Sequence, residues 1–553
     1  MLYYIEYLWK NGGSDLKLKS DKTKEDRDMF AETYSSIIDR VISFFILLLM
    51  LVFPLIYNNS YIDILVIKYQ FYWGCIVVML ALCLVLSFIM LIIDYKQNEG
   101  KHAKMIVSRL QPKNWSKTFC VTDISVIIFW IILVISTFQS DYFYESFWGN
   151  EGRYSGLFLL TLYVASYFMV SRFWTVKEWA LDVFLISGMV VCFIGITDYF
   201  RLDILHFHEK IAREEWDIFT STLGNINMYT AYIALVLGVA AAWFGVTKSK
   251  VRIIWCYLCM VVSSFAIIMG RSDNAYLALA ALFGFLPLIL FKNLTGIKRY
   301  LLMVATFGTV VQCIDFINQA YVDRVIGLDS LFEVLSNFNG LIYVVIGVWV
   351  AYVAVHIWSK NNQNKGEQAA PVLVYGWAGL LLLSVLAVCF LMFDANVAGN
   401  AKRYGALGRY LVFDDSWGTN RGYIWRKSLE LYREFKPMNK LFGHGLDTFG
   451  ILTNSKIKAE MPQLYENAHN EYLQYFITTG AAGLIAYVVF LGSAITRIWK
   501  RVEAKPYIIG CCFAIICYNT QALVNISLPI TSPMMWLLLS IGMASCNKRN
   551  ERI

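Results

Sequence analysis

Charged side chains are scarce in this chain, and their scarcity argues against a water-soluble globule. Asp, Glu, Lys and Arg make up 16% of the 553 residues, whereas 58% are hydrophobic. Nearly uncharged runs, each long enough to cross a bilayer at roughly 20 residues, recur along the sequence, for example at 41–57, 71–93 and 372–393. The sequence therefore predicts an all-α, polytopic membrane protein with about 12–14 transmembrane helices.

Cysteine is absent from the longest polar stretch, residues 394–468, so no disulfide or cysteine-based metal site organises that stretch. The twelve cysteines lie almost all within the hydrophobic runs, where a thiol behaves as a small apolar residue. We interpret Cys256, Cys259 and the Cys511–Cys512 pair as packing residues. The opening segment also lacks the apolar region and cleavage site of a signal peptide, and we expect a cytoplasmic tail there.

The net charge of +8 sorts by position along the chain, which indicates membrane topology rather than nucleic-acid binding. Every second connector is basic, and this pattern predicts that both termini lie in the cytoplasm. The expected organisation is a cytoplasmic tail (1–40), about eleven helices (41–393), a large extracytoplasmic catalytic loop (394–470), C-terminal helices (471–546) and a second tail (547–553).

The long outer loop is rich in Lys and Arg, which departs from the usual placement of positive charge inside. An anionic, lipid-linked substrate would explain the excess. Residues 421–435 have apolar side chains at helical spacing, and we expect a short amphipathic helix with Asn420 as its N-cap and Pro437 as its stop. Arg421 at the start of such a helix would form an anion site.

Three further outer segments carry candidate features. Arg153 stands among aromatic residues and glycines, where it is either a cation reaching the membrane interface or a ligand contact. Arg271 lies in a tight hairpin at the membrane boundary and needs an anionic partner, either Asp273 or a ligand. The spaced glycines of Gly443-His444-Gly445 predict a turn at which the backbone approaches another group closely, but not a phosphate-binding loop.

The stretch that begins at His469-Asn470 and continues to Gly480-Ala-Ala-Gly483 resembles the signature of the O-antigen ligase and polymerase superfamily of membrane glycosyltransferases. In that signature a His and an Asn, Ser or Gln are followed by nine residues and a Gly-x-x-Gly pair. Four further segments resemble family motifs in the same order: Leu223-Gly-Asn225-Ile-Asn227, Gly270-Arg271-Ser272, Arg421 with Trp425, and Gly443-His-Gly445 with Phe449. Two of them depart from the family, because Ile226 replaces a Pro and Gly270 replaces a Ser.

The resemblance covers roughly residues 140–545 and implies a GT-C-like bundle that transfers a glycan from a polyprenyl-diphosphate carrier on the outer leaflet. It implies no cofactor, nucleotide sugar or obligatory metal, and no residue cluster on this face has metal-ligand spacing in the sequence. The expected partners are the polyprenyl-diphosphate-linked glycan donor, a glycan, lipid or protein acceptor, and membrane lipids, with no nucleic acid.

Such a transfer needs a base for the acceptor hydroxyl and positive charge for the departing diphosphate. We predict His469 as the base, because an imidazole titrates near neutrality, and Arg153, Arg271 and Arg421 as the diphosphate clamp. Asn470 or Glu466 could orient the imidazole; the alternative is that His469 caps the helix through a hydrogen bond to Glu466. The remaining supporting candidates are Asn225, Asn227 and His444, of which His444 is expected to make mainly a local hydrogen bond.

Several alternatives stay open at this point. A flippase would also use many spans, but the sequence has no clear internal repeat and its polar motifs gather at one surface. A glycan-binding scaffold without turnover is a third hypothesis. Ligase, polymerase and protein oligosaccharyltransferase share these motifs, and both an inverting and a retaining outcome remain open. His206 and His208 are interpreted as surface residues or weak substrate contacts.

Overall fold

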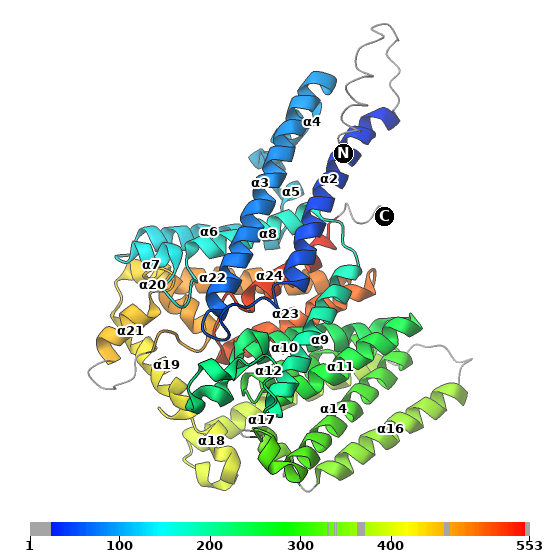
Figure 1. Cartoon of the computed structure of the whole chain (residues 1–553), viewed down its shortest axis with the longest axis vertical. Coiled ribbons are helices and arrows are strands. Elements are labelled where there is room, and N and C mark those ends of the chain that lie inside the picture. Colours follow the sequence, from blue (N-terminus) through cyan, green and yellow to red (C-terminus); the bar gives the residue numbers. More distant parts are fainter. Residues whose placement is uncertain are drawn as a thin grey trace.

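The computed structural model describes residues 24–328, 331–336, 338, 340–361, 371–457 and 465–547, and these fold into a bundle of helices (Figure 1). The predicted tails lie partly outside this range, as do most of the basic connector at 360–365 and part of the long loop. In the described part the only strands are the short antiparallel pair β1 (Phe219–Thr220) and β2 (Gly224–Asn225). The predicted all-α, polytopic fold is confirmed.

Eleven of the described helices are long and apolar enough to cross a membrane. They are α2 (Lys24–Leu51), α3 (Ile64–Asn98), α6 (Val121–Phe138), α9 (Trp179–Tyr199), α10 (Ile226–Val246), α11 (Lys250–Met269), α14 (Leu294–Ala320), α16 (Leu341–Asn361), α17 (Pro371–Asn396), α22 (Glu471–Arg501) and α23 (Ile509–Gln521) with its flanking turns. Shorter apolar helices are α8 (Leu157–Phe173), α12 (Asn274–Phe285) with α13 (Pro287–Leu290), and α24 (Ser532–Ala544). The apolar part of α2 starts at Phe30, inside the segment expected to be a tail.

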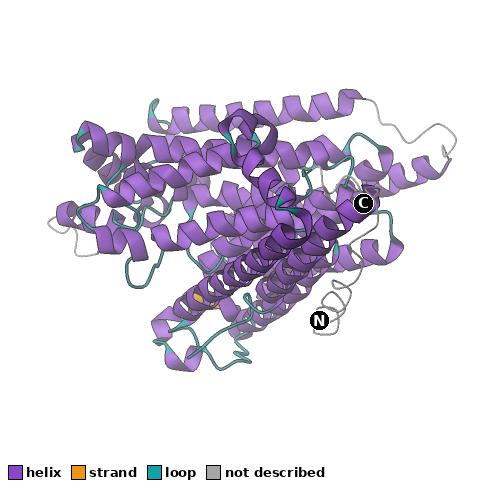
Figure 2. Ribbon diagram, turned by 90° about the horizontal axis from the view of Figure 1, so that it is seen from above, coloured by secondary structure: helices purple, strands orange, loops and turns teal. Residues whose placement is uncertain are grey.

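Helix α10 forms the centre of the bundle and is buried on every side. It packs most extensively on α23 and α11, and small residues allow the close approach. A Cβ placed on Gly238 of α10 would lie 2.9 Å from the backbone of Ala514 in α23. Around this core, α22 packs along α6 and α24 packs on α8. Figure 2 shows the helices lying side by side, with loops at their ends.

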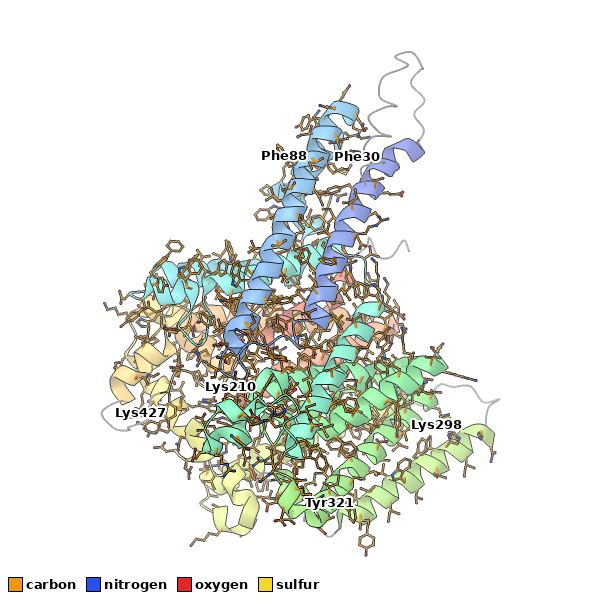
Figure 3. All side chains as sticks on the ribbon, viewed as in Figure 1. Phe30, Phe88, Lys210, Lys298, Tyr321 and Lys427 are labelled. Carbon is orange, nitrogen blue, oxygen red and sulfur yellow. The ribbon has the colours of Figure 1, made fainter. Side chains whose placement is uncertain are left out.

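The outermost helices leave apolar side chains exposed, as expected for a lipid-facing surface. Helices α16 and α17 bury almost none of their hydrophobic residues in the described part of the chain. Helices α2 and α3 extend beyond the bundle together with α4 (Lys101–Leu110), and Figure 3 places Phe30 and Phe88 on this projecting pair. At its base the fully buried Lys68 donates to the carbonyls of Phe53 and Pro54, at 2.8 and 3.0 Å, so its ammonium group is compensated.

The long polar loop folds into short helices along one side of the bundle, from α20 (Pro437–Phe442) beside α7 (Phe143–Trp148) to α18 (Gly408–Leu411) beside α17 (Figure 1). They are η7 (Ala401–Leu407), α18, α19 (Trp417–Glu434), α20 and α21 (Phe449–Ile457). The other short elements are η1 (Pro112–Asn114), α5 (Trp115–Thr118), η2 (His208–Lys210), η3 (Arg213–Ile218), η4 (Ser221–Leu223), η5 (Val322–Arg324), α15 (Leu331–Ser336), η8 (Pro506–Ile508) and η9 (Ala522–Val524).

Candidate functional site

A break in helix α22 provides the base on which the site is built. Gly480 has a φ of 70° and interrupts the helix, so the carbonyl of Thr478 is available to groups outside α22. That carbonyl accepts hydrogen bonds from the N–H groups of His444 and Gly445, at 3.1 and 3.0 Å, and from the hydroxyl of Ser136 at 2.8 Å. The loop turn is thereby fixed to the first turns of α22.

Glycine is required on both sides of this contact. A Cβ on Gly443 would lie 2.1 Å from the Thr478 carbonyl oxygen, and a Cβ on Gly480 would lie 2.3 Å from the carbonyl oxygen of Leu441. Both glycines also have positive φ, which disfavours any other residue. The close backbone approach predicted for the turn at 443–445 is confirmed, and its partner is the second glycine motif.

His469 lies directly before α22, on the polar side of the helix start. Its backbone is left-handed, with a φ of 46°, and its N–H donates to the side chain of Asn467 at 2.8 Å. Burial, followed by the charges of Arg421 and Arg153, lowers the pKa of His469 to about 4. The imidazole is therefore neutral at pH 7, and its side chain makes no hydrogen bond within the part of the chain that the structure describes. It is available to accept a proton.

Arg153 is held at the site by a buried carboxylate. Its Nε lies 3.5 Å from Oδ1 of Asp447, and its side chain is almost fully enclosed. Oδ2 of Asp447 accepts from the N–H groups of Asn150 and Ser155, so the glycine-punctuated turn of residues 149–156 folds around this carboxylate. Burial raises the pKa of Asp447, whereas Arg153 and the two N–H groups oppose that rise. A second carboxylate, Glu466, lies 3.7 Å from Arg153 but is exposed.

Arg421 enters the site because helix α19 changes direction just before it. Gly418, Thr419 and Asn420 are all left-handed, and regular helix follows from Arg421 to Glu434. The predicted helical stretch and its end before Pro437 are confirmed, but Asn420 is part of the left-handed run and not an ordinary cap. Burial lowers the pKa of Arg421, and the nearby Asp273 opposes the fall.

Arg271 lies in the hairpin that also carries Asp273. Its guanidinium is 3.8 Å from the exposed carboxylate of Asp217. The hairpin is fixed by Asn227, whose side-chain oxygen accepts from Ser272 at 2.6 Å and whose carbonyl accepts from Asn274 at 3.0 Å. Asn225 caps α10 by accepting from the N–H of Asn227. Asn227 therefore organises the hairpin while Asn225 caps α10, and the charge of Asp273 in the hairpin acts on Arg421.

A pocket that is partly open to solvent contains several of the predicted site residues. Arg153, Asp447 and His469 line it, together with Glu471 and residues of α8 and the connector after α23. Arg421 acts on His469 through its charge without lining the pocket. The structure thus places His469 and Arg153 in one pocket and brings Arg421 close enough to act on His469, whereas Arg271 does not line this pocket.

The predicted orienting residues have other partners. The side chain of Asn470 accepts from the N–H of Leu473 and caps α22, because a residue at the N-cap satisfies the free N–H groups of the first turn. Glu466 pairs with Arg153. Neither side chain is hydrogen-bonded to His469, so both the expected orienting contact and the alternative cap through Glu466 are absent from the structure. His444 does make a local contact, with Nδ1 3.0 Å from Asn439, and burial lowers its pKa.

Two acidic residues of the site, Asp447 and Glu471, were not predicted from the sequence, and a third, Asp273, was expected only as a partner of Arg271. Asp447 is the buried partner of Arg153, Asp273 acts on Arg421, and Glu471 lines the pocket. Asp447 follows the Gly443–Gly445 turn by two residues, which could have indicated it. Glu471 stands two residues after His469 at the start of an apolar span, where a carboxylate is costly and therefore informative.

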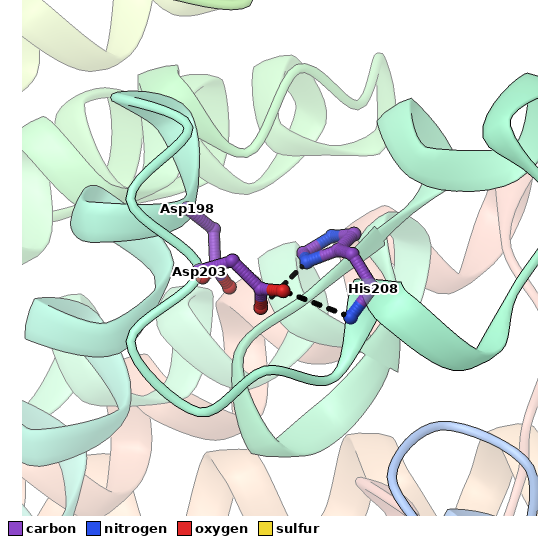
Figure 4. A group of neighbouring side chains, drawn as sticks. All are labelled: Asp198, Asp203 and His208. Carbon is purple, nitrogen blue, oxygen red and sulfur yellow. Dashed lines mark hydrogen bonds and ion pairs between the residues drawn. The ribbon is translucent and has the colours of Figure 1, made fainter.

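A separate cluster of side chains contradicts two expectations from the sequence, namely that this face has no group of possible metal ligands and that His208 lies at the surface. Asp198, Asp203 and His208 present possible metal-ligand atoms within 4.8 Å of one another, although their sequence spacing gave no sign of it (Figure 4). His208, expected at the surface, is buried. Its Nε2 contacts the Phe219 carbonyl at 3.1 Å and its Nδ1 contacts Asp203 at 2.9 Å. Both contacts are to oxygen atoms.

The fold and the site define a polytopic membrane protein whose site combines a histidine with the buried Arg153 and the partly buried Arg421. A family model described as O-antigen ligase matches residues 330–488, which include Arg421, the glycine turn and His469. No curated protein matches the chain. The chain therefore has a match to the O-antigen ligase family at residues 330–488, which confirms the resemblance seen in the motifs of that segment. The family indicates a membrane enzyme of polysaccharide assembly.

Proposed function

We propose that this protein transfers a glycan from a polyprenyl-diphosphate carrier to a hydroxyl group of an acceptor, on the outer face of the cytoplasmic membrane. The observation that carries the proposal is the presence of a neutral, partly buried His469 and of Arg153 in one pocket, with Arg421 acting on the same imidazole. In this proposal both termini lie in the cytoplasm, and the acceptor defines whether the reaction is that of a ligase, a polymerase or a protein oligosaccharyltransferase.

The proposed reaction is a single displacement. The imidazole of His469 takes the proton from the acceptor hydroxyl, the oxygen attacks the anomeric carbon, and the bond from that carbon to the diphosphate oxygen breaks. The guanidinium groups of Arg153 and Arg421 neutralise the charge that develops on the leaving diphosphate. Arg271 is proposed to contact the more distant phosphate or its lipid. Attack of this kind inverts the anomeric centre.

Because of the same arginines, the pKa of His469 should depend on whether the donor is bound. Their charge lowers the pKa of His469 when the pocket holds no anion. A bound diphosphate offsets this charge, so the pKa rises and the imidazole becomes a stronger base when the donor is present. Because arginines supply the positive charge, we propose that transfer needs no bound metal, and turnover should survive chelation by EDTA.

The test compares wild type, His469→Ala and His206→Ala, each purified in lipid with a polyprenyl-diphosphate oligosaccharide and candidate acceptors. His206 is an exposed histidine paired with Glu209 and serves as the matched control. We expect release of polyprenyl diphosphate from wild type and His206→Ala, and no release from His469→Ala with donor binding intact. Unchanged release by His469→Ala would remove the proposed base. Movement of the donor across the bilayer without release would favour a flippase.

A further inference from the structure

The inner wall of the pocket carries a carboxylate that the proposed mechanism does not use. Glu471 is only 3% exposed and lines the pocket together with His469 and Arg153. Its Oε1 accepts the hydroxyl of Tyr487 at 2.6 Å. Its Oε2 has no partner among the described residues. A buried carboxylate oxygen without a hydrogen-bond donor is costly, so a group that enters the pocket is needed to satisfy it.

A second unpartnered group lies on the same wall. Tyr163 in α8 is 2% exposed, lines the pocket, and has a hydroxyl without a partner in the described part of the chain. The Glu471 carboxyl is close enough to act electrostatically on this phenol. Two helices that are far apart in the sequence therefore each contribute a residue with an unpartnered polar atom to the wall of the same pocket.

The charge and the polar groups of this wall indicate which class of ligand it can bind. A carboxylate repels phosphate, so the wall does not extend the diphosphate site formed by the arginines. A single free carboxylate oxygen is also too few ligands for a divalent cation. A ligand with neighbouring hydroxyl groups fits, because one hydroxyl donates to Oε2 of Glu471 and another pairs with Tyr163. The rings of Tyr163 and Tyr475 and the side chain of Leu159 supply an apolar surface for the C–H face of a sugar.

We propose that Glu471 and Tyr163 form a sugar-binding subsite, which holds a glycan ring so that its reacting atom lies next to His469. The inference rests on the proposed function and specifies the sugar side of the same pocket. Its ligand is a sugar with adjacent free hydroxyls, which belongs either to the acceptor or to the first residue of the donor. Glu471 acts here as a binding and positioning residue, while proton transfer belongs to His469.

The first measurement is sugar binding without turnover. Methyl glycosides of glucose, galactose and N-acetylglucosamine are added to wild type, Glu471→Gln, Tyr163→Phe and His469→Ala in nanodiscs, and binding is followed by saturation-transfer NMR. We expect at least one glycoside to bind wild type and His469→Ala, and to bind Glu471→Gln and Tyr163→Phe at least tenfold more weakly. Glu503→Gln, an exposed carboxylate paired with Lys292 beyond the far end of α22, is the matched control and should bind as wild type does.

The Tm and the KM values of Glu471→Gln distinguish a role of Glu471 in sugar binding from a role in folding stability. Because Glu471→Gln replaces a buried carboxyl group by a neutral amide of nearly the same shape, its Tm should equal or exceed that of wild type. Its KM should rise at least tenfold for one substrate only. A rise for the acceptor assigns the subsite to the acceptor sugar, and a rise for the donor assigns it to the donor sugar.

Two results would overturn the proposal: equal sugar binding by wild type and Glu471→Gln, or no binding by wild type. A fall in Tm that accompanies the loss of binding would also overturn it. Sugar binding that depends on Glu471, in a wild-type protein that releases no polyprenyl diphosphate, would instead contradict the proposed transferase and leave the subsite standing.

Discussion

Removal of the charge on Arg421 should raise the pKa of His469. The pKa of His469 falls from 6.5 to about 4, which at 1.36 kcal/mol per pH unit corresponds to about 3 kcal/mol against the protonated imidazole. Burial is the largest cause, and Arg421 and Arg153 follow it. Arg421 therefore accounts for less than half of the fall, and Arg421→Gln should raise the pKa by at most about one pH unit.

The assay is modification of histidine by diethyl pyrocarbonate, which reacts with the neutral imidazole. The rate at the peptide that contains His469 is followed by mass spectrometry between pH 3.5 and pH 7.5, at about half-unit steps. Arg426→Gln is the matched control, because Arg426 lies on the same helix but pairs with the exposed Asp415 and Glu430. Its His469 midpoint should equal that of wild type.

Two results would refute the reasoning. A wild-type midpoint near 6.5 would mean that burial and the arginines do not act on His469. An unchanged midpoint in Arg421→Gln, or an equal rise in Arg426→Gln, would mean that Arg421 is not part of the site. A rise confined to Arg421→Gln would connect α19 to the imidazole by a measurement that does not depend on turnover.

Three further predictions concern stability. Gly480→Ala should destabilise the protein by roughly 2–4 kcal/mol, since the Cβ meets backbone at a positive φ, whereas Gly492→Ala on the same helix meets nothing within 4 Å; thermal unfolding compares the two. Asp447→Asn should cost about 2–4 kcal/mol because it leaves Arg153 buried without its partner, and the double variant Asp447→Asn/Arg153→Gln should recover part of that loss in a thermodynamic cycle. The folded-state pKa of His469 lies below its unfolded value, so its contribution to stability is present above pH 6.5 and is lost as the pH falls toward about 4; His469→Gln should show a smaller fall in denaturation midpoint over that range.

The sequence predicted those parts of the site that depend on local pattern. Apolar runs gave the bundle, and helical spacing after Arg421 gave the regular part of α19. The glycines at 443–445 indicated a close backbone contact, because a residue without a side chain is useful where two backbones meet. The order of the motifs placed His469 at a helix start, which is where it lies.

The partners within the site could not be predicted, because they join segments that are remote in the sequence. Nothing in the turn around Arg153 indicates Asp447, and nothing near Arg421 indicates Asp273. Asn470 shows a different limit. An Asn at this position can either orient His469 or serve as an N-cap. In the structure Asn470 is the N-cap, because the first turn of α22 needs acceptors for its N–H groups.

The carbonyl of Thr478 has a consequence for the family as a whole. It receives three donors from outside α22, and it can do so only because Gly480 interrupts that helix. The Gly-x-Gly turn and the Gly-x-x-Gly pair are therefore two halves of one contact. Relatives that lose the glycine at one position should have no constraint left at the other, so the two motifs are expected to be kept or lost together.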